Sequence, residues 1–167
     1  MKFAYADPPY IGQAKRHYGS EEVDHVLLLH QLESDYPDGW ALSCSSPSLQ
    51  QLLAICPDDV RVMAWVKPFA SFKPNVNPAY AWEPVIIRGG RKRTREQPTV
   101  RDWVSSNITL QRGLVGAKPE SFAMWLFQVL NIQDGDTLDD LFPGTNAVTK
   151  ALDKYRTNRQ LQLQVKP

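Results

Sequence analysis

The tetrapeptide Asp7-Pro8-Pro9-Tyr10 is the sharpest chemical signal in the sequence, and it directly follows an apolar stretch at residues 3–6. Proline fixes φ and lacks an N–H group, so this pair ends a strand and holds the chain rigid. The Asp7 carboxylate and the Pro8 carbonyl can then act as two fixed acceptors that face one point. Two acceptors suit an exocyclic amine, because hydrogen bonds from both N–H groups stabilise the positive charge that develops on a reacting nitrogen. Tyr10 can stack on the ring that carries the amine. The simpler interpretation is a rigid turn with an exposed tyrosine.

A second candidate site lies in the segment 137–155. Residues 137–142 are expected to form a strand, 143–146 a tight loop and 147–155 a helix. Gly144 lets the backbone turn and approach a ligand, and the N-terminus of the following helix offers free N–H groups to a carboxylate. An ordinary strand-to-helix turn is the alternative.

Strands and helices alternate along the chain, as the hydrophobic periodicity and the capping residues indicate. The tail alternates leucine or valine with glutamine, which is the period of a strand. The pattern predicts an α/β sandwich with a mostly parallel sheet, in which ligands bind beyond the carboxyl ends of the strands. The expected strands are 3–6, 40–44, 60–66, 81–87, 137–142 and 160–165, and the expected helices are 20–32, 46–55, 118–131 and 147–155.

The basic residues are concentrated in one segment, although the formal net charge of the chain is only +1. Residues 88–117 hold seven arginines and lysines against two acids, and the segment opens with two glycines. Such a block is typical of a cationic loop that contacts a polyanion. A solvated loop is the alternative interpretation.

The composition excludes several classes of protein. A length of 167 residues with 43% hydrophobic and 22% charged side chains fits one globular domain. No apolar run is long enough to cross a bilayer, and acid and prolines interrupt the N-terminus before a signal-peptide core, so we expect a cytoplasmic protein. Cys44 and Cys56 lack metal-ligand spacing, and the three histidines show none either, so neither a metal site nor a disulfide framework is expected.

The two candidate sites together resemble the amino-methyltransferases that act on DNA with S-adenosylmethionine (SAM). Asp7-Pro8-Pro9-Tyr10 is similar to the catalytic motif of that family, in which aspartate at the first place favours adenine and serine favours cytosine. Lys118-Pro119, the helix after it and the segment 140–146 are similar to the family's K-P helix and its D-x-F-x-G-S-G cofactor loop. The catalytic motif precedes the cofactor motif, which is the circularly permuted order of one branch; similar small proteins are common in bacteriophages of actinobacteria.

The resemblance implies a single Rossmann-like methyltransferase domain over residues 1–167, a three-layer sandwich of permuted order, with 88–117 as a basic loop insertion. It implies SAM as cofactor, DNA as substrate, no metal, no membrane and, for a phage protein, the host cytoplasm. The oligomeric state is not indicated. The implied catalytic residues are Asp7, Pro8, Pro9 and Tyr10. The implied cofactor-binding residues are Ala6, Asp7, Lys118, Pro119, Asp140, Phe142, Gly144, Thr145 and Asn146. The expected nucleic-acid contacts are Tyr10, Arg88, Arg91, Lys92, Arg93 and Arg95.

The chain departs from the family pattern in places that predict weak cofactor binding. Asn146 replaces a glycine, although asparagine tolerates left-handed geometry. The tail strand lacks the acid that usually holds the ribose of the cofactor, and no separate target-recognition domain is present. Methylation of cytosine N4, or of an RNA or protein amine, is the nearest alternative function, and a non-catalytic DNA-binding or regulatory protein is the more distant one. Glu83 is expected to be an edge-strand residue rather than part of the site.

Overall fold

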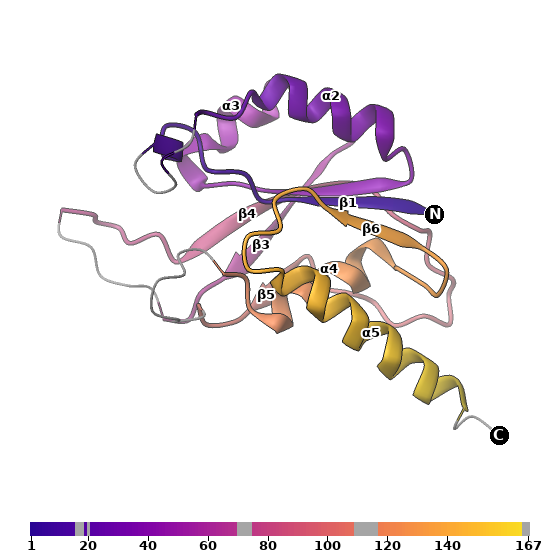
Figure 1. Ribbon diagram of the computed structural model, residues 1–167. Helices are drawn as coiled ribbons and strands as arrows, with labels where there is room; N and C mark the ends of the chain where they lie inside the picture. The colour runs from indigo at the N-terminus through magenta and orange to yellow at the C-terminus, as the bar shows by residue number, and fades with distance from the viewer. Residues whose placement is uncertain (16–18, 20, 70–74, 109–116, 165–167) are drawn as a thin grey trace.

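The computed structural model describes residues 1–164 except 16–18, 20, 70–74 and 109–116 (Figure 1). Its centre is a six-stranded sheet in the order β5-β3-β4-β2-β1-β6. Strand β1 pairs in parallel with β2 and β6, β3 pairs in parallel with β5, and β4 runs antiparallel to both of its neighbours. The strands are β1 (Lys2–Ala6), β2 (Gly39–Ser43), β3 (Arg61–Val66), β4 (Trp82–Gly89), β5 (Trp103–Ser105) and β6 (Thr137–Asp140).

Helices cover both faces of this sheet and make three layers (Figure 1). Helices α2 (His25–Asp35) and α3 (Leu49–Leu53) lie on one face, and α4 (Glu120–Leu130) and α5 (Ala147–Gln164) lie on the other. The alternation of side chains along β1 explains why both faces are apolar. Phe3 and Tyr5 pack in the cluster around α4, while Ala4 and Ala6 pack in the cluster around α2. The fold is therefore the α/β sandwich that the sequence predicts.

Strand positions agree with the prediction more closely than helix ends do. Helix α2 begins at His25 because the Asp24 carboxylate caps it, accepting hydrogen bonds from the N–H groups of Val26 and Leu27. The prediction of a helix start at Ser20 is therefore wrong, and Ser20 itself lies outside the described residues. The expected helix 46–55 is a 3-10 turn at Ser46–Ser48 followed by α3.

The largest correction concerns the tail. Residues 160–164 continue helix α5 and do not form the predicted strand. Leucine and glutamine are both good helix formers, and no proline or glycine interrupts the chain between 147 and 164, so a helix already begun propagates through the segment. A two-residue alternation favours a strand only where a neighbouring strand is available to pair with it.

The basic block is also more structured than expected. Its first residues end β4, and Trp103–Ser105 form β5, which lies beside β3 at one edge of the sheet. The opposite edge is β6, which pairs only with β1 among the described residues.

Candidate active site

Strands β1, β2, β3 and β6 all have their carboxyl ends at the same end of the sheet. Strands β1, β2 and β6 are mutually parallel, and β3 has the same direction as β2 because each runs antiparallel to β4. Asp7 follows β1, Asp140 ends β6 and Lys67 follows β3 at this end of the sheet. Glu83 lies at the same end, near the start of the antiparallel strand β4. These ends carry the polar groups that form the candidate site.

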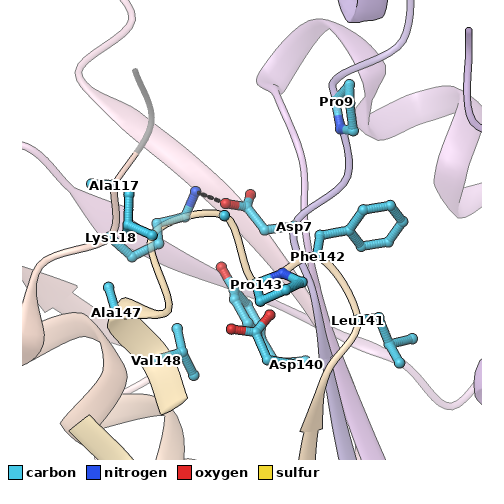
Figure 2. A pocket seen from close by; sticks show the side chains of 13 residues that line it. Asp7, Pro9, Ala117, Lys118, Asp140, Leu141, Phe142, Pro143, Ala147 and Val148 are labelled. Carbon is cyan, nitrogen blue, oxygen red and sulfur yellow. Dashed lines mark hydrogen bonds and ion pairs between the residues drawn. The ribbon is translucent and has the colours of Figure 1, made fainter. Parts of the chain in front are cut away.

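Asp7 is held by Lys118, which comes from the segment just before α4. Lys118 Nζ donates to Asp7 Oδ2 at 2.7 Å, and both side chains are largely buried (Figure 2). Burial raises the pKa of Asp7 above its ordinary value, and the nearby Lys118 ammonium opposes that rise only in part. The sequence placed both residues in the site, and the structure brings them into direct contact.

Glu83 is a site residue that the sequence analysis misjudged. Its strand β4 is central, paired with β2 and β3, so the expectation of an edge-strand glutamate is wrong. Tyr10 Oη donates to Glu83 Oε2 at 2.7 Å, Lys67 forms an ion pair with Glu83, and Lys118 Nζ lies 3.6 Å from its carboxylate. Burial acts to raise the pKa of Glu83, but the two ammonium groups and the tyrosine hydroxyl outweigh it and leave the pKa lowered. Glu83 is therefore a buried carboxylate held in its charged form.

The Glu83 network also fixes Tyr10. Burial, together with the neighbouring carboxylates, raises the pKa of the Tyr10 hydroxyl well above its usual range. The hydroxyl therefore stays protonated and donates to Glu83, which orients the half-buried ring. The only sequence signal for this contact was an acidic residue inside an otherwise apolar strand.

A cavity of about 380 Å³ opens between the ends of β1 and β6. It is large enough for a small organic ligand, since ligand pockets span roughly 300 to 1,000 Å³. Figure 2 shows the carboxyl groups of Asp7 and Asp140 at this cavity. Six of the predicted cofactor residues line it, namely Asp7, Lys118, Asp140, Phe142, Gly144 and Thr145.

The other three predicted cofactor residues are not among those that line the cavity. Ala6 is fully buried within β1, and Pro119 occupies the N-cap position of α4. Asn146 adopts the left-handed conformation with φ of 56°, the geometry that asparagine tolerates. Pro8 of the predicted catalytic motif is buried, while Pro9 lines the cavity.

Asp140 carries a buried oxygen without a partner. Its Oδ1 atom forms no hydrogen bond to any described residue, although the side chain lines the cavity. Burial raises the pKa of Asp140 to about 6, and the neighbouring Asp7 carboxylate adds to the rise. A buried acceptor of this kind calls for a donor, because an unsatisfied polar group costs about 1–3 kcal/mol.

The loop after Asp140 leaves room for a ligand. Gly144 has φ of 46°, and a side chain built on it would meet only the Phe142 carbonyl oxygen, at 3.9 Å. The backbone there faces open space at the cavity.

Apart from Tyr10, the residues predicted to contact nucleic acid do not lie at the end of the sheet that carries the candidate site. Arg88 lies near the carboxyl end of β4, which is at the other end of the sheet because β4 is antiparallel to β2. Arg88 forms ion pairs with Glu33 and Asp59, and Arg91 forms one with the buried Asp136. Arg93 donates to backbone carbonyl oxygens, while Lys92 and Arg95 are exposed. Much of this basic charge therefore has an intramolecular role.

Among the described residues, no group of three or more His, Cys, Asp or Glu side chains is arranged to hold a metal ion. None of the helices in the described part of the chain is long and apolar enough to cross a membrane.

Comparison with solved structures shows a shared α/β fold at low sequence identity. One match is the crystal structure of the M1.HpyAVI–SAM complex, with a TM-score of 0.63 at 11% identity, covering 92% of this chain and 78% of that one. Another is M1.HpyAVI, with a TM-score of 0.58 at 13% identity, covering 92% and 77% of the two chains. No protein-family profile and no curated protein sequence matches the chain. At these identities the likeness concerns the fold.

Proposed function

We propose that the protein transfers a methyl group from SAM to the exocyclic N6 amine of adenine in DNA. The observation that carries the proposal is the pair of carboxyl groups, Asp7 and Asp140, that share one cavity at the ends of adjacent strands. Asp7 opens a motif that can accept an amine, and Asp140 ends the strand that precedes the glycine loop at the cavity. The fold shared with the M1.HpyAVI–SAM complex supports SAM as that ligand.

The residues of the cavity fit this cofactor. The unpartnered Asp140 Oδ1 is an acceptor suited to the α-ammonium group of a methionine moiety. The open space at Gly144 suits a ligand that lies against the backbone, and Phe142 adds apolar contact. When bound, SAM would supply an electrophilic methyl group on a sulfonium.

The amine side of the reaction falls to the catalytic motif. The Asp7 carboxylate and the Pro8 carbonyl accept hydrogen bonds from the two N–H groups and stabilise the charge that develops on nitrogen. The nitrogen gains a methyl group and must lose one proton. The raised pKa of Asp7 makes its carboxylate a suitable acceptor for that proton.

Tyr10 and its partners have a positioning role in this proposal. Glu83 holds the Tyr10 hydroxyl, so the ring is oriented before the substrate binds. A base turned out of its stack regains about 1–3 kcal/mol by stacking on such a ring. Lys67 and Lys118 balance the charges of Glu83 and Asp7, which allows two carboxylates to stay close together away from water.

We further propose that residues 1–167 act as one methyltransferase domain of permuted order. The strand that precedes the catalytic motif comes first in the chain, and the strand that precedes the cofactor loop comes last, yet the two are neighbours in the sheet. Aspartate at the first place of the motif supports adenine over cytosine as the target.

The test is a methylation assay followed by identification of the product base. The protein is incubated with methyl-labelled SAM and DNA, the DNA is digested, and the nucleosides are separated. We expect N6-methyladenine from wild type and none from Asp7→Ala. The Leu27→Ala variant, which changes an exposed residue of α2, serves as a matched control and should retain activity.

The outcomes separate the alternatives. N4-methylcytosine, or methylated RNA or protein in parallel incubations, would move the assignment to another amine. Absence of any methylated product, together with no SAM binding in calorimetry by folded protein, would favour the non-catalytic alternative. A Gly144→Val variant should lose SAM binding because its side chain enters the cavity and its backbone is strained at positive φ.

A further inference from the structure

Among the described residues, no helix covers one part of the sheet. Val62, Ala64 and Val66 of β3 are aligned with Trp82 of β4 and Trp103 of β5, so their side chains share one face. This is the face that α2 and α3 cover elsewhere, since Ile86, the partner of Val62, packs in the cluster around α2. Near β5 that cover is missing, and Val62, Trp82 and Trp103 are 40%, 39% and 41% exposed.

The uncovered face is hollowed and aromatic. These residues line an open groove of about 600 Å³. Two further exposed aromatic side chains, Phe69 and Tyr80, come from the segment that joins β3 to β4. Tryptophan side chains are costly to leave in water, and exposed apolar patches of this kind mark binding sites.

One cation lies beside the groove. The Arg101 guanidinium lies 5.2 Å from the centre of the Trp103 ring. Asp102 also lines the groove, and its carboxylate lies 3.7 Å from Arg61, which is on the α4 side of β3. An arginine beside flat aromatic rings is complementary to a strand of phosphates and bases.

The groove reaches the end of the sheet that carries the candidate active site, on the other face of β4. Trp82 and Glu83 are consecutive residues that point to opposite faces of β4, and Lys67 directly follows Val66 of the groove. From β1 to β5 there are four strand spacings of about 4.8 Å, or about 19 Å across the sheet. A few nucleotides span that distance, so one strand could reach both places.

We propose that this groove, formed by Val62, Ala64, Val66, Trp82 and Trp103, binds the single-stranded nucleotides that flank the target base. The inference rests on the proposed function in supposing a nucleic-acid substrate. Bases stack on Trp82 and Trp103, and Arg101 contacts a phosphate. Because stacking does not depend on base identity, the groove contributes affinity and leaves the choice of target to the Asp7 site.

The test uses an oligonucleotide that cannot be methylated at an exocyclic amine. Thymine has no such amine, so a twelve-residue oligothymidylate reports strand binding without the reaction. We expect the wild-type protein to raise the fluorescence anisotropy of a dye-labelled form of this oligonucleotide on binding. The Trp82→Ala, Trp103→Ala double variant should bind at least about tenfold more weakly, since each stacked ring contributes appreciably to affinity.

Two further variants keep the result interpretable. Trp103→Phe retains a ring and should restore most of the binding lost in Trp103→Ala, which a merely structural role would not predict. Leu27→Ala should bind like wild type. SAM affinity, measured by calorimetry, should be the same in wild type and the double variant, which shows that the folded site persists.

Three outcomes would overturn the inference. One is the absence of oligothymidylate binding by wild type, and another is equal binding by the double variant. The third is a change of self-association in the double variant, measured by light scattering, with strand binding unchanged; the groove would then be a contact between copies. A failure of the proposed function is a separate result, because it appears as missing base methylation while oligothymidylate binding still depends on the two tryptophans.

Discussion

Two carboxylates of the candidate site, Asp7 and Glu83, show how the immediate surroundings divide chemical roles. Both are largely buried and both contact Lys118, yet the pKa of Asp7 is raised and that of Glu83 is lowered. The difference arises because Glu83 has Lys67 and the Tyr10 hydroxyl in addition. Glu83 is thus suited to hold its neighbours in place, and Asp7 is suited to exchange a proton with a substrate.

Replacement of Asp7 by asparagine tests the role of its charge. Asparagine keeps an acceptor oxygen but cannot balance the charge on the amine, so we expect Asp7→Asn to lower kcat by about 10²–10³, as loss of one such stabilising group does. Lys118 retains Glu83 as a partner, so the midpoint of urea unfolding should change little. Wild-type turnover by Asp7→Asn would contradict the catalytic role.

Asp140 predicts a pH dependence of cofactor binding. Its pKa is raised to about 6, so the carboxyl group is neutral below that pH and charged above it. Only the charged form attracts an ammonium group, and SAM affinity should therefore rise as the pH increases through about 6. Calorimetry between pH 5 and 7.5 measures this. In Asp140→Asn the affinity should be weak and flat across the range; a steep dependence that persists would assign it to another group.

At the scale of elements, hydrophobic pattern predicted five of the six strands, because side chains alternate between the two faces of the sheet, but it missed the largely exposed β5. The two segments predicted to form the site directly follow β1 and β6. The sequence pattern could not predict which of two competing structures a segment would adopt, or which strands would become neighbours. The tail alternation yielded to helix propensity once α5 had begun, and Glu83 became central only because β4 inserts between β2 and β3.

The start of β6 is anchored by Asp136, which predicts a stability effect. The Asp136 carboxylate is buried and accepts hydrogen bonds from the N-terminal ammonium group, Arg91 and the N–H of Gln133. Burial acts to raise its pKa, but these partners outweigh it and lower the pKa to about 2. The contribution to stability is full above about pH 4, the ordinary range for aspartate, and is lost as the pH falls toward 2.

Asp136→Asn should therefore lower the free energy of unfolding by about 2 kcal/mol at pH 7. The difference from wild type should shrink as the pH falls from 4 toward 2, because the wild-type carboxylate is then protonated as well. Urea unfolding at several pH values measures both quantities. An equal difference at pH 7 and at pH 2.5 would show that the loss comes from packing and not from charge.

At the scale of the whole molecule, the charge map of the sequence was a poor guide to the position of the site. The basic block begins at the end of the sheet opposite the cavity. Arg88 and Arg91 form ion pairs with carboxylates that are distant in sequence. Pairings of that kind depend on the tertiary fold. The exposed Lys92 and Arg95 remain the candidates of this segment for contact with DNA phosphates.

A salt titration separates the two ends of the molecule. In the Lys92→Ala, Arg95→Ala variant, we expect the log–log salt slope of binding to a long duplex to fall by up to about 0.9 per lost contact. The salt slope for binding of a twelve-residue single strand should not change, because we expect that strand at the groove and the candidate active site, at the other end of the sheet. An unchanged slope on long duplex DNA would assign both residues to solvent.

The position of β6 at the open edge of the sheet has a consequence for colloidal behaviour. An edge strand presents unpaired backbone groups that invite another chain, and short length and charged side chains are the usual safeguards. Strand β6 has four residues and ends in two aspartates, Asp139 and Asp140. The pKa of Asp140 is about 6, so mild acid removes one of these two charges. The carboxyl group that lines the cavity then no longer helps to prevent β6 from pairing with another chain, which favours aggregation.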